Sequence, residues 1–201
     1  MTGERAMRIA VTGRTGQLAR ALRERAGGAG AEVVCVSRPE LDLSEPGMLA
    51  DLFRAVRPDV IVNAAAYTAV DKAESEPDLA RAINVDGARI VAEAARDLAV
   101  PVVQMSTDYV FAGTRGTPYR EDDRTGPRSV YGVTKLAGEV AVTKISPDHM
   151  VVRTSWVYSP FGHNFVRTLL RLGGERDGGA GADAQRRAPA TALALAGGRL
   201  A

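Results

Sequence analysis

The sequence predicts an α/β protein built on a doubly wound parallel sheet. Short, nearly continuous apolar runs alternate along the chain with longer segments whose apolar residues recur at helical spacing. Strands that are apolar at successive positions are typical of a parallel sheet covered by helices on both faces. A glycine-containing turn directly follows the first run, at the place where such sheets form their ligand sites.

Each element follows from a local pattern. The expected strands are RIAVTG (8–13), EVVCVS (32–37), DVIVNAAA (59–66), VPVVQMS (100–106) and HMVVRTS (149–155). The expected helices carry apolar residues three or four positions apart, at Leu18, Ala21 and Leu22, at Met48, Leu49, Leu52, Phe53 and Val56, at Val91, Ala94, Ala95 and Leu98, and within YGVTK and NFVRTLLRL. Ser44 is the expected N-cap of the second helix. The alternating order predicts a Rossmann-like fold.

Composition narrows the class of protein. The 201 residues are 45% hydrophobic, enough for one sizeable core, and the formal net charge is only +2. Interspersed charges argue against a nucleic-acid or membrane partner. The single cysteine, Cys35, allows no internal disulfide, and His149 and His163 are the only histidines, so no metal site is expected. This use of cysteine and histidine fits a reducing cytoplasm, where we expect the protein to be. No apolar run reaches the roughly 18 residues of a membrane span.

The last residues differ in composition from the rest of the chain. Glycine and alanine dominate from Gly173 onward, and no strand pattern is visible there. We expect one domain over residues 1–172 and a Gly/Ala-rich tail over residues 173–201 that is disordered or transiently helical.

The turn after the first strand, TGRTGQLA, predicts a phosphate-binding loop. Gly13 permits a tight turn, and Gly16 lets the backbone approach a ligand at the N-terminus of the next helix. Ala19 stands where the full GxGxxG pattern has its third glycine. A simple strand-to-helix turn is the alternative.

The end of the second strand bears on cofactor choice. An NAD site would carry an acid there for the adenosine ribose, whereas this chain has Ser37 and Arg38. A guanidinium at this corner can pair with a 2′-phosphate, so NADPH is expected, with NADH as a weaker alternative. Arg38 as an ordinary exposed loop residue remains the other reading.

Tyr131 and Lys135 are four residues apart in SVYGVTKLAGE, and they therefore share one face of the predicted helix. Such a pair can converge on one small molecule, with the lysine ammonium lowering the pKa of the phenol. An amphipathic tyrosine beside a solvated lysine is the alternative.

Several motifs occur in a fixed order: TGRTGQL, RPELDLS, VNAAAYTAVDKAE, STDYVFAG, PYREDD, VYGVTKLAGE and RTSWVYSPFGHNFV. From about Met7 to Leu172 the chain resembles the dTDP-4-dehydrorhamnose reductases, which are extended short-chain dehydrogenases. Family members continue beyond the matching segment into a substrate-binding lobe. The resemblance therefore implies that this lobe is largely missing and that the chain is truncated or frame-shifted after about Asp177.

The resemblance assigns roles position by position. It implies catalytic roles for Thr107, Tyr131 and Lys135, with Ser106 as the rival of Thr107. The glycine-containing turn and the end of the second strand already predict cofactor contacts at Gly13 and Arg38. The resemblance implies further cofactor contacts at Gly16, Gln17, Leu18, Asp42, Leu43, Ala66, Tyr67, Thr68, Tyr131 and Lys135. Substrate contacts are implied at Val70, Thr107, Asp108, Tyr109 and Trp156, where a buried core role is the alternative for Trp156.

The implied activity is reduction of the C4 ketone of a dTDP-4-dehydro-6-deoxyhexose by NADPH, in nucleotide-sugar biosynthesis. Two alternatives stay open: a non-catalytic module resembling the regulatory subunit of methionine adenosyltransferase, and an inactive reductase. An epimerase or dehydratase ranks lower, because a dehydratase would need a further acid and base beside the threonine. Family members form dimers that use magnesium, but the carboxylates for it lie beyond the matching segment. The expected partners are a dTDP-sugar and a second copy of the chain.

Overall fold

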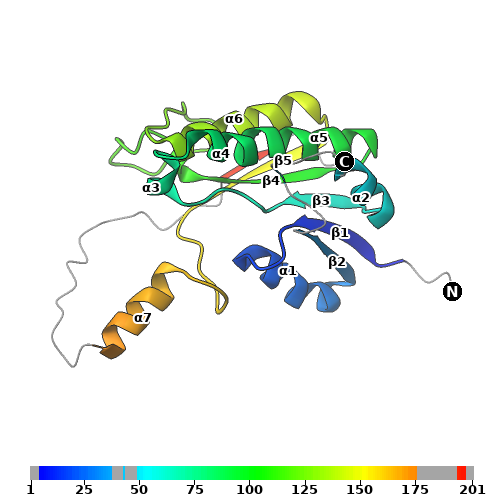
Figure 1. Ribbon diagram of the computed structural model, residues 1–201, viewed down its shortest axis with the longest axis horizontal. Helices are drawn as coiled ribbons and strands as arrows, with labels where there is room; N and C mark the ends of the chain where they lie inside the picture. The colour runs from blue at the N-terminus through cyan, green and yellow to red at the C-terminus, as the bar shows by residue number, and fades with distance from the viewer. Residues whose placement is uncertain (1–4, 38–42, 44–48, 176–193, 198–201) are drawn as a thin grey trace.

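The computed structural model describes residues 5–37, 43, 49–175 and 194–197. These residues form a sheet in the order β2-β1-β3-β4-β5-β6 (Figure 1). Strands β1 to β5 pair in parallel, as predicted. Their bounds are β1 (Met7–Thr12), β2 (Ala31–Val36), β3 (Val60–Asn63), β4 (Val102–Thr107) and β5 (His149–Thr154).

Helices cover both faces of the sheet, which confirms the doubly wound prediction. The helices are α1 (Gln17–Ala26), α2 (Leu49–Val56), α3 (Val70–Ala73), α4 (Pro77–Arg81), α5 (Gly87–Asp97), α6 (Val130–Ile145) and α7 (Phe165–Glu175). Helix α1 lies on one face, and α2, α5 and α6 lie on the other (Figure 1). A π-helical turn, η3 (Ala82–Asp86), joins α4 to α5, and two short 3-10 helices are η1 (Gly27–Ala29) and η4 (Asp108–Val110). None of the helices among the described residues has the length and apolar character to cross a membrane.

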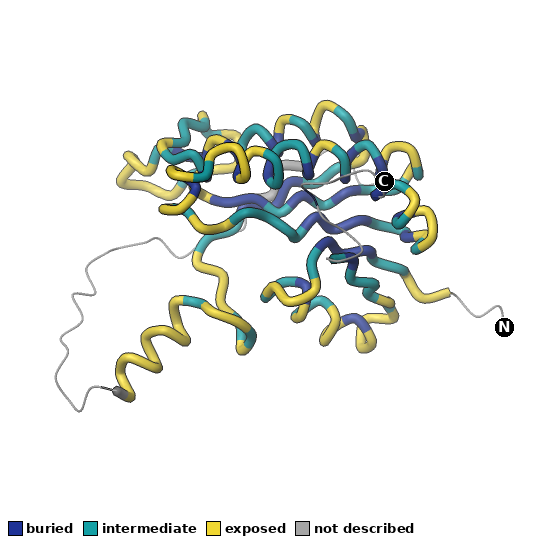
Figure 2. Tube along the Cα trace, viewed as in Figure 1, coloured by how far each residue is buried: buried dark blue, intermediate teal, exposed yellow. Residues whose placement is uncertain are grey.

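The apolar strand residues divide between two cores. On one face, Phe53 and Leu49 of α2 and Val91 of α5 pack on Ile61. The opposite face packs more thinly, against Ala19 and Leu22 of α1 among others. The sheet is the buried centre of the tube in Figure 2, whereas α7 is exposed along its length. The predicted face of the second helix is therefore correct at Leu49 and Phe53, while Met48 and Ser44 lie outside the described residues.

The edge strand β6 (Ala194–Gly197) was not predicted. It pairs antiparallel with β5, with Met150 opposite Gly197. Pairing at a sheet edge uses backbone groups, so a Gly/Ala-rich segment can join without any alternating pattern of side chains. Helix α7 also continues past the predicted domain boundary, through Gly173 and Gly174. Residues 176–193 and 198–201 of the predicted tail lie outside the described residues.

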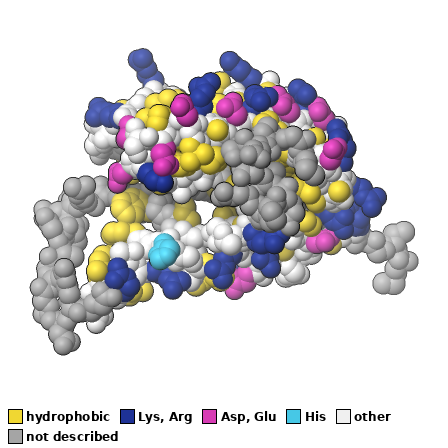
Figure 3. Space-filling view, viewed as in Figure 1, with side chains coloured by type: hydrophobic (Ala, Val, Ile, Leu, Met, Phe, Trp, Pro, Cys, Tyr) yellow, Lys and Arg dark blue, Asp and Glu magenta, His cyan; other side chains and the backbone are white. Residues whose placement is uncertain are grey.

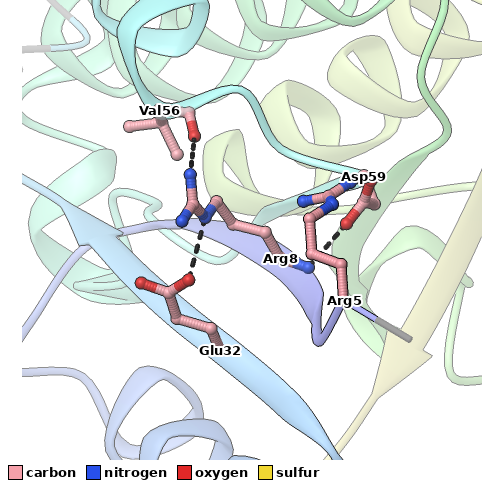
Figure 4. Close-up of polar contacts among 5 residues, drawn as sticks. All are labelled: Arg5, Arg8, Glu32, Val56 and Asp59. Carbon is pink, nitrogen blue, oxygen red and sulfur yellow. Dashed lines mark hydrogen bonds and ion pairs between the residues drawn. The ribbon is translucent and has the colours of Figure 1, made fainter. Parts of the chain in front are cut away.

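Charged residues connect the amino-terminal ends of β1, β2 and β3 (Figure 4). Arg8 donates through Nε to Glu32 Oε2 at 2.9 Å and through Nη1 to the carbonyl of Val56 at 3.1 Å. Asp59 accepts from the backbone N–H of Arg8 at 2.7 Å and from Arg5. Exposed ion pairs of this kind contribute little stability, so we read this cluster as a structural connection of β1 to β2 and β3.

Candidate active site

A cleft of ≈ 1700 Å³ opens at the carboxyl ends of the parallel strands. The space-filling view is hollowed between the two layers of the molecule (Figure 3). Every described residue that the sequence predicted for the site lines this cleft: Gly13, Gly16, Gln17, Leu18, Ser37, Leu43, Ala66, Tyr67, Thr68, Val70, Thr107, Asp108, Tyr109, Tyr131, Lys135 and Trp156. Arg38 and Asp42 lie outside the described residues.

The turn between β1 and α1 has the geometry of an anion-binding loop. Gly13 has a φ of 92°, a conformation that side chains disfavour. Gly16 is the N-cap of α1, and no side chain caps that end of the helix. A Cβ added to Gly16 would meet no heavy atom within 4 Å, so the backbone borders open cleft. The first amides of α1 can therefore donate to a ligand, and the helix dipole favours a negative charge there.

Ala19 occupies the third position of the glycine pattern. It is 2% exposed and packs in the same apolar cluster as Val11 and Val62. This is the close contact between helix and strand that the pattern requires of a small residue.

Helix α6 brings Tyr131 and Lys135 into the cleft. Ser129 caps the helix by accepting from the N–H of Gly132 at 3.1 Å. The Tyr131 ring packs edge-on against Tyr109, with centroids 5.5 Å apart, and Lys135 is only 4% exposed. The alternative of a solvated surface pair is therefore wrong.

The two pKa values move in directions that the sequence did not predict. Burial lowers the pKa of Lys135 to about 8, and the nearby negative charge of Glu139 opposes this fall. Burial raises the pKa of Tyr131, while a hydrogen bond with Thr107 lowers it and Asp108 raises it. The Lys135 ammonium donates to the Met105 carbonyl at 2.7 Å. The expected lowering of the Tyr131 pKa is wrong in this structure, because burial of the phenol outweighs the interactions that lower its pKa. Tyr131 is consequently held as a neutral phenol, the form that can donate a proton.

Neighbouring residues Ser106 and Thr107 have different partners. The Ser106 hydroxyl donates to Glu139 Oε1 at 2.5 Å, and both residues are buried. The Thr107 hydroxyl donates to Asp108 Oδ1 at 3.2 Å, accepts from the N–H of Tyr109 at 3.3 Å, and lies close enough to Tyr131 to lower the pKa of its phenol. The geometry favours Thr107 over Ser106 as the group beside the proton donor.

Trp156 also lines the cleft. Its side chain is 50% exposed and its φ is 53°, an unusual backbone conformation for a residue other than glycine. The ring packs edge-on against Phe165 of α7, with centroids 4.8 Å apart. The alternative of a core tryptophan is therefore wrong.

A buried polar chain crosses the strands beneath the cleft, and our sequence reading missed it. Thr12 donates to Asn63 Oδ1 at 2.7 Å, and Asn63 donates to Gln104 Oε1 at 2.7 Å. Gln104 donates in turn to the Met105 carbonyl that Lys135 uses, at 2.9 Å. The sequence does contain a signal for this chain, because Thr12, Asn63 and Gln104 are polar residues within or at the end of strands that are otherwise apolar.

The π-helical turn places another buried amide next to the cleft. Asn84 is 3% exposed and accepts from the N–H of Tyr67 at 2.9 Å. It also donates to the Tyr67 carbonyl and to Thr134, each at 3.1 Å. Asn84 therefore fixes the backbone of a predicted cofactor residue against α6. No pattern in the sequence marked this residue.

Within the described part of the chain, no group of three or more His, Cys, Asp or Glu side chains could hold a metal ion.

Comparisons with known proteins agree with this geometry. A family model described as the RmlD substrate binding domain matches residues 7–200. A dTDP-4-dehydrorhamnose reductase of Sinorhizobium fredii is 53% identical over 171 residues, covering 85% of this chain and 57% of that protein. Another, from Salmonella typhimurium, is 54% identical and covers 67% of this chain and 45% of that protein. The chain thus spans about half the length of the curated relatives it matches.

A solved structure is similar over the same region. The dTDP-4-dehydrorhamnose reductase of Bacillus anthracis, crystallised in complex with NADP, has a TM-score of 0.81 and 40% identity. The match covers 85% of this chain and 60% of that one. Fold, cleft and sequence matches agree, and the chain belongs to the RmlD substrate binding domain family.

Proposed function

We propose that the protein takes part in NADPH-dependent reduction of the C4 ketone of a dTDP-4-dehydro-6-deoxyhexose, in the cytoplasm, as a step of nucleotide-sugar biosynthesis. The observation that carries the proposal is the grouping of Tyr131, Thr107 and Lys135 in the cleft that the glycine loop also lines. The relatives named above support the reaction, and the Bacillus anthracis structure supports the cofactor.

The residues present fit a dinucleotide. The uncapped N-terminus of α1 and the open backbone at Gly16 suit a pyrophosphate. Tyr67 and Thr68, beyond the end of β3, suit the adjoining ribose, and Leu43 lines the cleft at 6% exposure, on the side proposed for the adenine. When bound, the nicotinamide supplies the hydride. Residues 1–172 are proposed as the unit that binds the cofactor and carries the catalytic groups.

The side chains of this chain supply a proton and hold the ketone. As negative charge develops on the carbonyl oxygen, the neutral phenol of Tyr131 can donate its proton to it. The Thr107 hydroxyl, which lines the same cleft and donates to Asp108 in this structure, can turn to orient the same oxygen by a hydrogen bond. Lys135 can turn from the Met105 carbonyl to a cofactor hydroxyl in the same cleft. Asp108, Tyr109, Val70 and Trp156 surround the space proposed for the hexose.

The non-catalytic alternative is weaker. A module that only bound a dinucleotide would need the glycine loop but no proton donor. Burial of the Lys135 ammonium, which its hydrogen bond to the Met105 carbonyl offsets only in part, is a costly feature with no role in such a module. A dehydratase is a weaker alternative as well, because it would need a further acid and base beside Thr107. Among the described residues that line the cleft, Asp108 is the only carboxylate.

A second copy of the chain is the proposed protein partner. Helix α6 leaves Val133 and Val140 about half exposed, one heptad apart on its outer face. Apolar residues at this spacing suit packing against another helix. The oligomeric state can be checked by sedimentation with and without Val140→Lys.

A direct assay tests the proposed reaction. The chain, and a version extended to the length of its relatives, would be given dTDP-4-dehydrorhamnose and NADPH, and the product would be identified by mass spectrometry. We expect a dTDP-6-deoxyhexose with one NADPH oxidised per ketone reduced. Cofactor binding without any reduction in the extended version would favour the non-catalytic module.

A further inference from the structure

Three consecutive residues at the end of β4, Met105 to Thr107, each lie beside one of three residues of α6 that are spaced one helical turn apart. The Met105 carbonyl accepts from Lys135 Nζ at 2.7 Å, the Ser106 hydroxyl donates to Glu139 Oε1 at 2.5 Å, and Thr107 lies close enough to Tyr131 to lower the pKa of its phenol. Tyr131 and Lys135 belong to the proposed catalytic set. Glu139, on the same face of α6, has no role assigned to it so far.

The Glu139 carboxylate is enclosed by donors. Arg153 of β5 donates to it through Nε at 3.0 Å and through Nη2 at 2.7 Å, in addition to the Ser106 hydroxyl. The Glu139 and Arg153 residues are 4% and 8% exposed. Arg153 also donates to the Glu121 carbonyl at 3.0 Å, and its guanidinium lies 5.0 Å from the centre of the Phe111 ring. Both oxygens of the Glu139 carboxylate therefore accept hydrogen bonds, and these bonds fix the position of the side chain.

A buried ion pair is a poor device for stability alone. Removing two charges from water costs several kcal/mol per ion, and apolar residues of similar volume often serve as well. The position of this pair suggests a different use. Glu139 lies one helical turn beyond Lys135, whose ammonium is itself buried. The charges of the pair therefore act on the Lys135 ammonium, and the negative charge of Glu139 raises its pKa.

We propose that Glu139 is a positioning residue, which locks α6 to the end of β4 through Ser106 and provides the buried negative charge next to Lys135, with Arg153 as its counter-ion. The inference rests on the proposed function for the role of Lys135. The cleft that Lys135 lines also carries Tyr131 on the same helix, and Asp108 and Tyr109 of η4, both of which raise the pKa of Tyr131. None of these is paired with Arg153 by a described contact.

Opposite charge changes at the two positions provide the test. Glu139→Gln leaves the Arg153 cation unbalanced and should shift the Lys135 titration to lower pH. Arg153→Met leaves the Glu139 anion unbalanced and should shift it to higher pH. Each shift should be about one pH unit or more, the usual effect of a nearby charge. The double variant removes both charges and should titrate near the wild type.

The measurement does not depend on activity. Lys72, Lys135 and Lys144 are the only lysines in the sequence, so ¹³Cε-lysine labelling gives three NMR signals to follow against pH. Lys135→Met identifies the signal of interest. Glu93→Gln is the matched control, because it breaks an exposed ion pair with Arg89 on the neighbouring helix α5 and should leave the Lys135 titration in place.

The outcomes separate positioning by charge from a merely structural role. Shifts of the two single variants in the same direction, or no shift in either, would overturn the proposal. If one single variant does not fold by far-UV circular dichroism, the other single variant decides. A shift of its Lys135 midpoint by about one unit in the stated direction supports the proposal. A folded single variant that titrates like the wild type, or the failure of both to fold, overturns it. A chain with no reductase activity would contradict the proposed function and leave these titrations readable.

Discussion

Lys135 Nζ donates a hydrogen bond to the backbone carbonyl of Met105 over 2.7 Å, in a site where the lysine is 4% exposed. The same carbonyl accepts from Gln104, the last side chain of the polar chain that begins at Thr12. The ammonium is thus held at the floor of the cleft before any ligand arrives. Holding a charge there costs free energy, and that cost can be measured.

The first prediction concerns stability against pH. The pKa of Lys135 is about 8 in the folded protein, against 10.5 ordinarily. Between these values the unfolded chain binds a proton that the folded chain has lost, so the free energy of unfolding rises with pH across this window and not below it. Lys135→Met should remove this rise and stabilise the protein at neutral pH by about 1–3 kcal/mol.

Urea unfolding at neutral pH and at about pH 10 would measure the difference between variant and wild type at each pH. The difference should be largest at neutral pH. Lys144→Met, at an exposed position of the same helix, should show no such difference. A Lys135→Met protein less stable than the wild type at neutral pH would contradict the assigned pKa direction.

The second prediction concerns the proton donor. In a protein extended to the length of the relatives, Tyr131→Phe should lower kcat by roughly a hundredfold or more, as expected for loss of a general acid. Cofactor affinity should stay close to the wild-type value, because the ring and its packing on Tyr109 remain. Single-turnover reduction and NADPH fluorescence titration measure the two quantities. Near-normal reduction by the variant would exclude Tyr131 as the donor.

The third prediction concerns cofactor choice. The protein should bind NADPH more tightly than NADH, because Ser37 and Arg38 replace the acid of an NAD site. Arg38→Ala should weaken NADPH binding by about tenfold and leave NADH binding unchanged, since a charge-assisted hydrogen bond contributes about 1.5–3 kcal/mol when fully formed. Arg57→Ala removes the arginine that follows α2, at a position that does not line the cleft, and serves as control. Equal affinities of the wild type for both cofactors would contradict the argument.

The fourth prediction concerns the packing of α6. A Cβ on Gly138 would lie 2.2 Å from the carbonyl oxygen of Asn84, so the helix would have to move away from η3. Gly138→Ala should therefore destabilise the protein by about 1–3 kcal/mol, the usual cost of overpacking. It should also disturb Tyr67, which Asn84 holds.

Gly173→Ala is the matched comparison, because it adds the same methyl group within α7, where no heavy atom lies within 4 Å. It should be neutral or stabilise the helix by up to about 1 kcal/mol. Chemical denaturation of both variants measures the contrast. Equal effects at Gly138 and Gly173 would show that α6 and η3 are not in close contact.

Local pattern sufficed for the parallel strands, their helices and the glycine loop, because each has its own spacing in the sequence. The strand β6 could not be predicted, since edge pairing through backbone groups leaves no side-chain signature. The partners of Lys135 were missed for another reason. The burial of Lys135 and its hydrogen bond to the Met105 carbonyl depend on how α6 packs on β4. These two elements are far apart in the sequence, and local patterns do not specify how they pack.

Asn84 shows the same limit on a smaller scale. Its role depends on a π-helical turn, which adds one residue to a helical turn and turns the amide toward Tyr67. The spacing of apolar residues in the segment is consistent with an ordinary helix. Arg153 and Glu139 each looked like a charged residue of a strand or helix, and only their mutual contact reveals them as a pair.

The docking of α6 on three successive residues of β4 limits how the chain can change in length. One residue inserted between Tyr131 and Glu139 would rotate the following part of the helix by about 100° and carry Glu139 away from Ser106. The exposed loop from Ala112 to Arg128, between the same two elements, holds none of these contacts. Insertions and deletions among natural variants should therefore collect in that loop and be absent from α6 between Tyr131 and Glu139.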